Sequence, residues 1–146
     1  MTRFMLIAVA AFSLSLSTIG CGSKAADCNK LIESINNDKP DFEKARELGD
    51  IGEAVAEFEK LATGVKEFSD KLAALDLKDE TVAKHRDDYK KMLDASATEL
   101  KGAAQALEAM KSKPDPVKLK RVAAGFEAVQ KKENQLVTSI NGYCGG

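Results

Sequence analysis

Apolar residues recur at heptad spacing through three long stretches of the chain. In the stretch that begins at Ile51, every position at alternating steps of three and four residues is apolar. These positions hold Ile51, Ala54, Phe58, Leu61, Val65, Phe68, Leu72 and Leu75. The period places all of them on one side of an α-helix, which must bury that side against other helices. The pattern therefore predicts a helical bundle with coiled-coil-like packing.

Two further stretches repeat this pattern with few interruptions. Over residues 82–110, Arg86 and Ser96 interrupt an otherwise apolar series, and over residues 119–143 Glu133 does so. Two interpretations of these three polar residues are open. They lie at the edge of the bundle, with the Arg86 stem along apolar surface and its charge in water, or they form a polar patch that binds a partner.

Aspartates stand where each of these helices should begin. Asp50, Asp79 and Asp115 each precede a heptad stretch, and Asp115 is followed by a proline. An aspartate oxygen accepts hydrogen bonds from the free amides of a first helical turn, and proline suits the first helical position. The Asn141-Gly142 pair predicts the end of the last helix.

The segment before Asp50 predicts a less regular first helix. Its apolar face runs over roughly Ala26–Leu48, and we expect it to be kinked or broken near Pro40. No segment alternates apolar and polar residues as a strand would. We therefore predict an all-α fold, an antiparallel up-down four-helix bundle, in which an even number of helices returns the chain to its starting end.

The first twenty residues have the organisation of a secretory signal peptide. Arg3 is followed by an apolar stretch and then by small and hydroxylated residues, and the next charge is Lys24. A membrane-spanning helix needs about 20 mainly apolar residues, and serines dilute the second half of this stretch. A retained membrane helix is therefore the less favoured alternative.

The sequence Thr18-Ile19-Gly20-Cys21 resembles the lipobox of bacterial lipoproteins, although leucine is more usual than Thr18 three places before the cysteine. The resemblance covers residues 1–21. It implies that a peptidase removes residues 1–20 and that Cys21 becomes the acylated first residue of the mature protein. Residues 21–26 would then form a flexible lipidated tether and residues 27–146 the bundle domain. Ordinary secretion, with Cys21 as a plain thiol, is the alternative.

The same resemblance implies a location. In Gram-negative lipoproteins an aspartate directly after the lipidated cysteine often retains the protein in the inner membrane, and Gly22 stands at that place. We therefore expect lipid anchoring in the outer membrane, with the domain facing the periplasm or the cell surface.

Two cysteines remain after Cys21 is set aside. Cys28 and Cys144 lie near opposite ends of the mature chain, and an exported compartment permits a disulfide between them. Such a bond would close a loop of more than 100 residues, for which chain entropy predicts a stabilisation of about 5 kcal/mol. A zinc or redox pair is the alternative, but the chain has no C-x-x-C motif and one histidine.

Few residues offer catalytic chemistry. His85 is the only histidine, and it is either a solvated helical residue or a ligand in a haem- or metal-binding bundle. With a single histidine, and with Cys28 and Cys144 assigned to a disulfide, the sequence shows no hydrolase triad, and no phosphate-binding glycine motif occurs. An enzyme with an unrecognised site would need a deep pocket, which an alanine-rich bundle usually lacks.

The net charge and the aromatic content of the chain limit the kinds of partner that it can bind. The net charge is −1 and aromatic residues make up 5% of the chain, which argues against nucleic-acid binding. We predict a lipid-anchored, non-enzymatic binding or scaffolding module without a cofactor. Its partners are a membrane, through the lipid, and a protein on exposed helix faces. The alternative function is a haem- or metal-binding bundle that uses His85.

Overall fold

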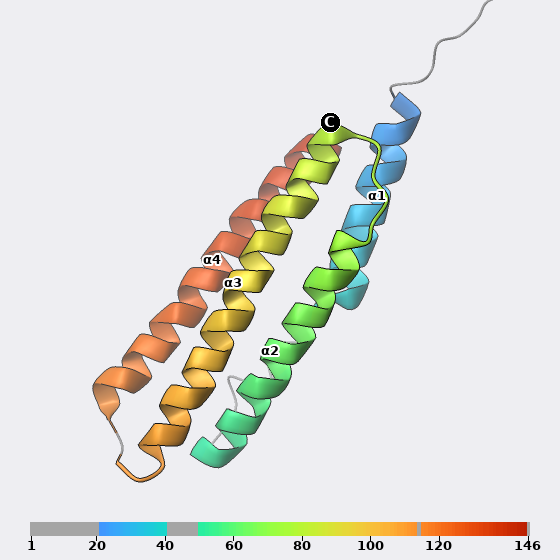
Figure 1. Cartoon of the computed structure of the whole chain (residues 1–146). Coiled ribbons are helices and arrows are strands. Elements are labelled where there is room, and N and C mark those ends of the chain that lie inside the picture. Colours follow the sequence, from blue (N-terminus) through green and yellow to red (C-terminus); the bar gives the residue numbers. More distant parts are fainter. Residues whose placement is uncertain (1–20, 41–49, 114, 146) are drawn as a thin grey trace, which may run out of the picture.

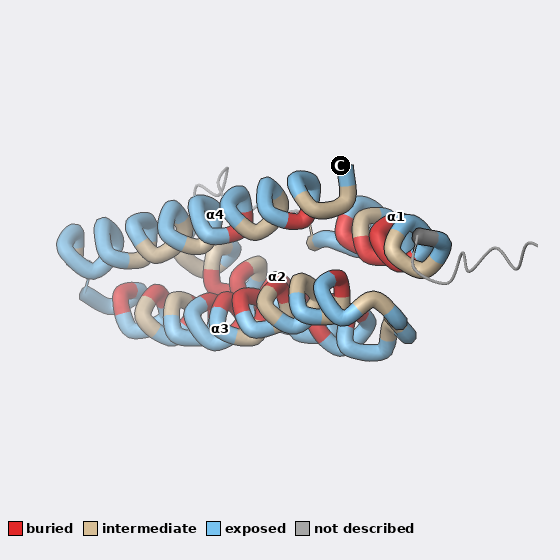
Figure 2. The backbone as a smooth tube through the Cα atoms, turned by 90° about the horizontal axis from the view of Figure 1, so that it is seen from above, coloured by how far each residue is buried: buried red, intermediate tan, exposed pale blue. Residues whose placement is uncertain are grey.

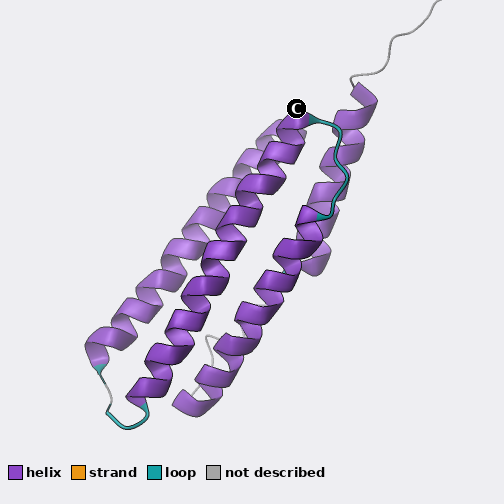
Figure 3. Cartoon of the chain, in the orientation of Figure 1, coloured by secondary structure: helices purple, strands orange, loops and turns teal. Residues whose placement is uncertain are grey.

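The computed structural model describes residues 21–40, 50–113 and 115–145. These residues form the helices α1 (Cys21–Asp38), α2 (Ile51–Ala73), α3 (Glu80–Met110) and α4 (Pro116–Cys144). Figure 3 shows helices and connecting loops, with no strand in the described ranges. Successive helices run in opposite directions (Figure 1), so the predicted all-α, antiparallel up-down bundle is confirmed. The predicted signal peptide lies outside the described residues.

The helices form two layers. α1 and α4 lie in one layer and α2 and α3 in the other, and the buried residues face the space between the layers (Figure 2). The 31 residues of α3 span about 46 Å. α1 has 18 residues and covers only the half of the bundle that is nearest to the C-terminus (Figure 1).

The most extensive packing joins α2 and α3. Ala62, Ala97 and Ala104 are buried and small, so the two backbones can approach each other closely. Deeper in the core, the rings of Phe68 and Tyr89 meet edge to face with their centroids 6.3 Å apart. This helix pair forms the rigid half of the bundle against which α1 and α4 pack.

The three predicted helix starts are confirmed. Asp50 accepts hydrogen bonds from two amides of the first turn of α2, and Asp79 and Asp115 do the same at α3 and α4. Pro116 occupies the first turn of α4. These side chains satisfy amides that no helical carbonyl can reach.

The predicted break of the first helix near Pro40 is confirmed, and the helix begins earlier than predicted. α1 ends at Asp38, two residues before Pro40, because a proline cannot continue the hydrogen-bond pattern and disfavours helical geometry just before it. Residues 41–48, predicted as its continuation, lie outside the described residues. The predicted flexible tether over 21–26 is wrong, because α1 begins at Cys21. Lysine and alanine there favour helix, and Lys24 Nζ lies 4.4 Å from the centroid of the Tyr143 ring.

The last helix does not end at the Asn141-Gly142 pair. α4 continues to Cys144, and the amide of Gly145 donates to the Asn141 carbonyl at 2.8 Å. No glycine of the described residues has a positive φ, so Gly142 provides no stop. Bonds made by Tyr143 and Cys144 to other helices hold this final turn in place.

Candidate functional site

A disulfide closes the end of the bundle where the chain ends meet. Cys28 of α1 and Cys144 of α4 are bonded, with their Cα atoms 5.6 Å apart across a sequence separation of 116. Cys28 is buried. The structure thus brings together the two cysteines that the sequence predicts as a pair. Cys21 lies seven residues before Cys28 on the same helix, about 10 Å along its axis.

The neighbouring Asp27 ties this end of α1 to the start of α3. Its side chain is buried, and its Oδ2 accepts hydrogen bonds from the amides of Lys78 at 2.5 Å and Asp79 at 2.7 Å. The bonds from Asp79 and Lys78, together with the charge of Lys30, hold the pKa of Asp27 below its ordinary value. An ionised Asp27 therefore fixes α1 to the connection between α2 and α3.

Tyr143 completes this cluster from α4. Its hydroxyl donates to the carboxylate of Asp79 at 3.2 Å, and the same carboxylate caps α3. The His85 ring lies against Tyr143, with centroids 5.7 Å apart. Contacts from α1, α3 and α4 therefore converge on the end of the bundle that holds the disulfide, about 10 Å along α1 from Cys21.

A second polar cluster lies inside the bundle. Tyr89 of α3, with 0% exposure, donates from its hydroxyl to Glu133 Oε1 of α4 at 2.8 Å. Lys39, just after α1, places its Nζ 2.7 Å from the same oxygen. Burial, and then the charge of Glu133 and the hydrogen bond to it, raise the pKa of Tyr89 well above its ordinary value. The cluster links three parts of the chain through one carboxylate.

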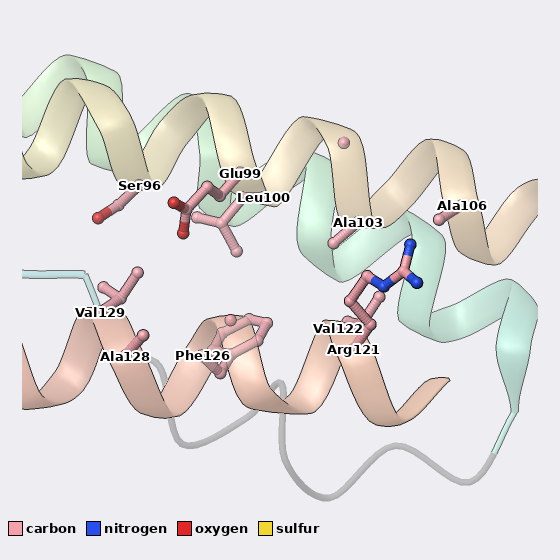
Figure 4. Close-up of a pocket in the computed structure, with 12 residues that line it drawn as sticks. Ser96, Glu99, Leu100, Ala103, Ala106, Arg121, Val122, Phe126, Ala128 and Val129 are labelled. Carbon is pink, nitrogen blue, oxygen red and sulfur yellow. The ribbon is translucent and has the colours of Figure 1, made fainter. Parts of the chain in front are cut away.

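An apolar groove separates α3 from α4 in the half of the bundle that α1 does not cover. It encloses about 320 Å³. Its lining consists of Ser96, Glu99, Leu100, Gly102, Ala103 and Ala106 of α3, with Arg121, Val122, Gly125, Phe126, Ala128 and Val129 of α4. Figure 4 shows the two walls facing each other. The groove is centred about 30 Å along α4 from Cys144, so the disulfide end and the groove lie in opposite halves.

The groove has an apolar floor and charges at its rim. Phe126 meets Phe58 of α2 edge to face at 5.0 Å, which closes the groove toward the core. The Ser96 hydroxyl donates to the Met92 carbonyl at 2.8 Å and is thereby occupied. Glu99 and Arg121 supply the only charged side chains of the lining. The groove forms because α4 stands further from α3 than α2 does, and its apolar lining differs from the deep pocket of titratable groups that an enzyme would need.

A family model described as uncharacterised lipoprotein PM1805 matches residues 25–141. The chain belongs to this lipoprotein family. No curated protein and no solved structure gave a match. Membership agrees with the lipobox-like sequence that precedes the matched region, and it fits a lipid-anchored protein of the cell envelope. None of the helices in the described ranges combines the length and apolar character that crossing a membrane requires.

The residues that were predicted to carry chemistry in this lipoprotein lie in different parts of the structure. Cys21 opens α1, and its acylation stays a prediction. His85 is half-buried against Tyr143. In the ranges 21–40, 50–113 and 115–145, no three His, Cys, Asp or Glu side chains are grouped so that they could hold a metal ion. No observation therefore favours the haem- or metal-binding alternative.

The three polar residues on the apolar stripes are not edge residues as a group. Ser96 and Glu133 are buried in the lipoprotein core, and each has a hydrogen-bond partner inside the bundle. Arg86 is partly exposed, and its Nη1 donates to the Leu75 carbonyl just after α2 at 2.8 Å. The edge position is therefore confirmed for Arg86 and wrong for Ser96 and Glu133, and the partner-binding patch stays a prediction.

Sequence reasoning missed two glycines of the groove. Gly102 of α3 and Gly125 of α4 lie in helix interiors, where glycine costs up to about 1 kcal/mol relative to alanine. Glycines also lie inside helices at Gly64 and Gly142, away from the groove, so the sequence alone did not single out Gly102 and Gly125.

Proposed function

We propose that the chain is a lipid-anchored, non-enzymatic binding module, attached to the bacterial outer membrane through an acylated Cys21. The observation that carries this proposal is the continuity of α1 from Cys21 to the disulfide. A helix that links the anchor directly to a cross-linked base transmits the position of the anchor to the whole bundle. The groove then lies in the half of the bundle that is further from the membrane.

The groove favours binding over catalysis. Catalysis needs a nucleophile or base with an oriented partner. The lining offers one hydroxyl, that of Ser96, which is bonded to a backbone carbonyl, and two charges at the rim. An apolar cleft with a few polar groups at its edge is typical of a ligand site.

Metabolic labelling with an alkyne analogue of palmitate tests the anchor. We expect label on the wild-type protein and none on Cys21→Ser. The double variant Cys28→Ser/Cys144→Ser is the matched control, because it removes the other two thiols and should keep the label. Label that persists in Cys21→Ser, or that is absent from the wild type, would overturn the proposal.

A further inference from the structure

We propose that the groove between α3 and α4 binds a single-chain anionic amphiphile, with its acyl chain between the two helices and its headgroup at Arg121. The inference rests on the proposed function only in taking this groove as the ligand-binding face. Two observations support it: the length and apolar lining of the groove, and the charges at its rim.

The shape fits one hydrocarbon chain. The groove follows α3 from Ser96 to Ala106, which is about 15 Å of helix. Most of the side chains along this length are apolar or small, and the volume of the groove is about 320 Å³. The length and the apolar lining of the groove therefore suit an extended acyl chain.

Two glycines of the lining make the groove easy to fill by substitution. A Cβ atom placed on Gly102 or Gly125 would meet no atom within 4 Å outside its own helix turn. Both residues line the groove from opposite walls. A large side chain at either position can therefore occupy the groove without a clash at its Cβ atom.

The two charges at the rim favour one orientation of the ligand along the groove. Within the described part of the chain, neither Arg121 nor Glu99 forms an ion pair or a hydrogen bond. Figure 4 shows the Arg121 guanidinium reaching toward Ala106 at one end of the groove, with Glu99 at the other. An unpaired cation attracts an anionic headgroup and the carboxylate repels it. The acyl chain would therefore extend from Arg121 toward Val129.

Calorimetric titration with dodecanoate, below its micelle concentration, tests the proposal. The protein is the full chain carrying Cys21→Ser, so that no lipid of its own competes. The key variant is Gly125→Leu, which fills the groove from one wall. Gly142→Leu is the matched control, because Gly142 is a helical glycine of α4 that also has open space around it and lies outside the groove.

We expect saturable one-to-one binding that Gly142→Leu preserves and that Gly125→Leu weakens by tenfold or more, with the helical circular dichroism of both variants intact. Arg121→Glu should weaken dodecanoate binding about tenfold and leave dodecanol unaffected. From octanoate to dodecanoate, affinity should rise about fourfold for each added methylene. Absence of saturable binding, or equal binding by Gly125→Leu, would overturn the inference. Palmitate labelling of Cys21 does not depend on this outcome, so the two proposals fail separately.

Discussion

Tyr89 and Glu133 form a 2.8 Å hydrogen bond across the interior of the bundle, between α3 and α4. Both residues lie on the apolar stripes of their helices, and Glu133 is 8% exposed. The ammonium of Lys39 balances the carboxylate from the end of α1. Sliding of α4 along α3 would separate the buried carboxylate from these two partners and leave a charge unpaired. The pair therefore favours one register of α4 against α3.

Removing the Tyr89 hydroxyl should destabilise the bundle. We expect Tyr89→Phe to lower the free energy of unfolding by about 2 kcal/mol, because a hydrogen bond to a buried charged group is lost. Urea denaturation measures the change. Tyr143→Phe is the matched control: its hydroxyl bond is longer and partly exposed, so we expect a loss of no more than about 1 kcal/mol. Equal losses in the two variants would show that the Tyr89–Glu133 hydrogen bond stabilises the fold no more than the Tyr143–Asp79 bond does.

Alkaline pH should destabilise the bundle by ionising Tyr89 in the same pair. The raised pKa of Tyr89 means that its contribution to stability is complete below the ordinary tyrosine pKa of about 10 and is lost as the pH rises toward the folded value. The chain has two tyrosines, so the variant Tyr143→Phe leaves Tyr89 as the only chromophore of its kind. Its phenolate absorbance should appear together with the loss of helical circular dichroism. Ionisation near pH 10 in a folded protein would contradict the burial.

Lowering the pH should destabilise the end of the bundle that holds the disulfide, because Asp27 becomes protonated. Its pKa is lowered, so its contribution is present above the ordinary aspartate pKa of about 3.9 and is lost as the pH falls through the lowered value. We expect Asp27→Asn to be less stable than the wild type at pH 7, with the difference shrinking toward about pH 3. Urea denaturation at both pH values measures this. The exposed Glu127→Gln variant is the control for loss of one negative charge, and a similar profile for it would count against a specific role for Asp27.

The residue after Cys21 should decide the membrane. By resemblance to Gram-negative lipoproteins, Gly22 permits transport to the outer membrane and aspartate would retain the protein in the inner one. We expect Gly22→Asp to move the protein to the inner-membrane fraction of a density gradient, while the uncharged Gly22→Asn stays with the wild type. An unchanged distribution of Gly22→Asp would argue that location is set elsewhere.

Sequence patterns were sufficient where local rules decide the structure. The heptad stripe from Ile51 and the aspartates at 50, 79 and 115 each act within one helix, and all of these predictions are confirmed. The meeting of Cys28 and Cys144 followed from counting antiparallel helices.

Tertiary contacts decided the rest. From the sequence, Glu133 is expected at the edge of the bundle. Only the folded structure shows that it contacts Tyr89 and Lys39. The last turn of α4 is retained through bonds to residues far away in the sequence. The groove depends on how far α4 stands from α3, and no single-helix pattern reports that distance.

Intact mass spectrometry of the membrane-extracted protein, before and after reduction, tests most directly how the three cysteines are used. We predict a chain that begins at Cys21, carries the added mass of acyl groups and gains two hydrogen atoms on reduction, when Cys28 and Cys144 become free thiols. A chain that starts at Met1, a mature chain without acyl mass, or two free thiols before reduction would contradict this account.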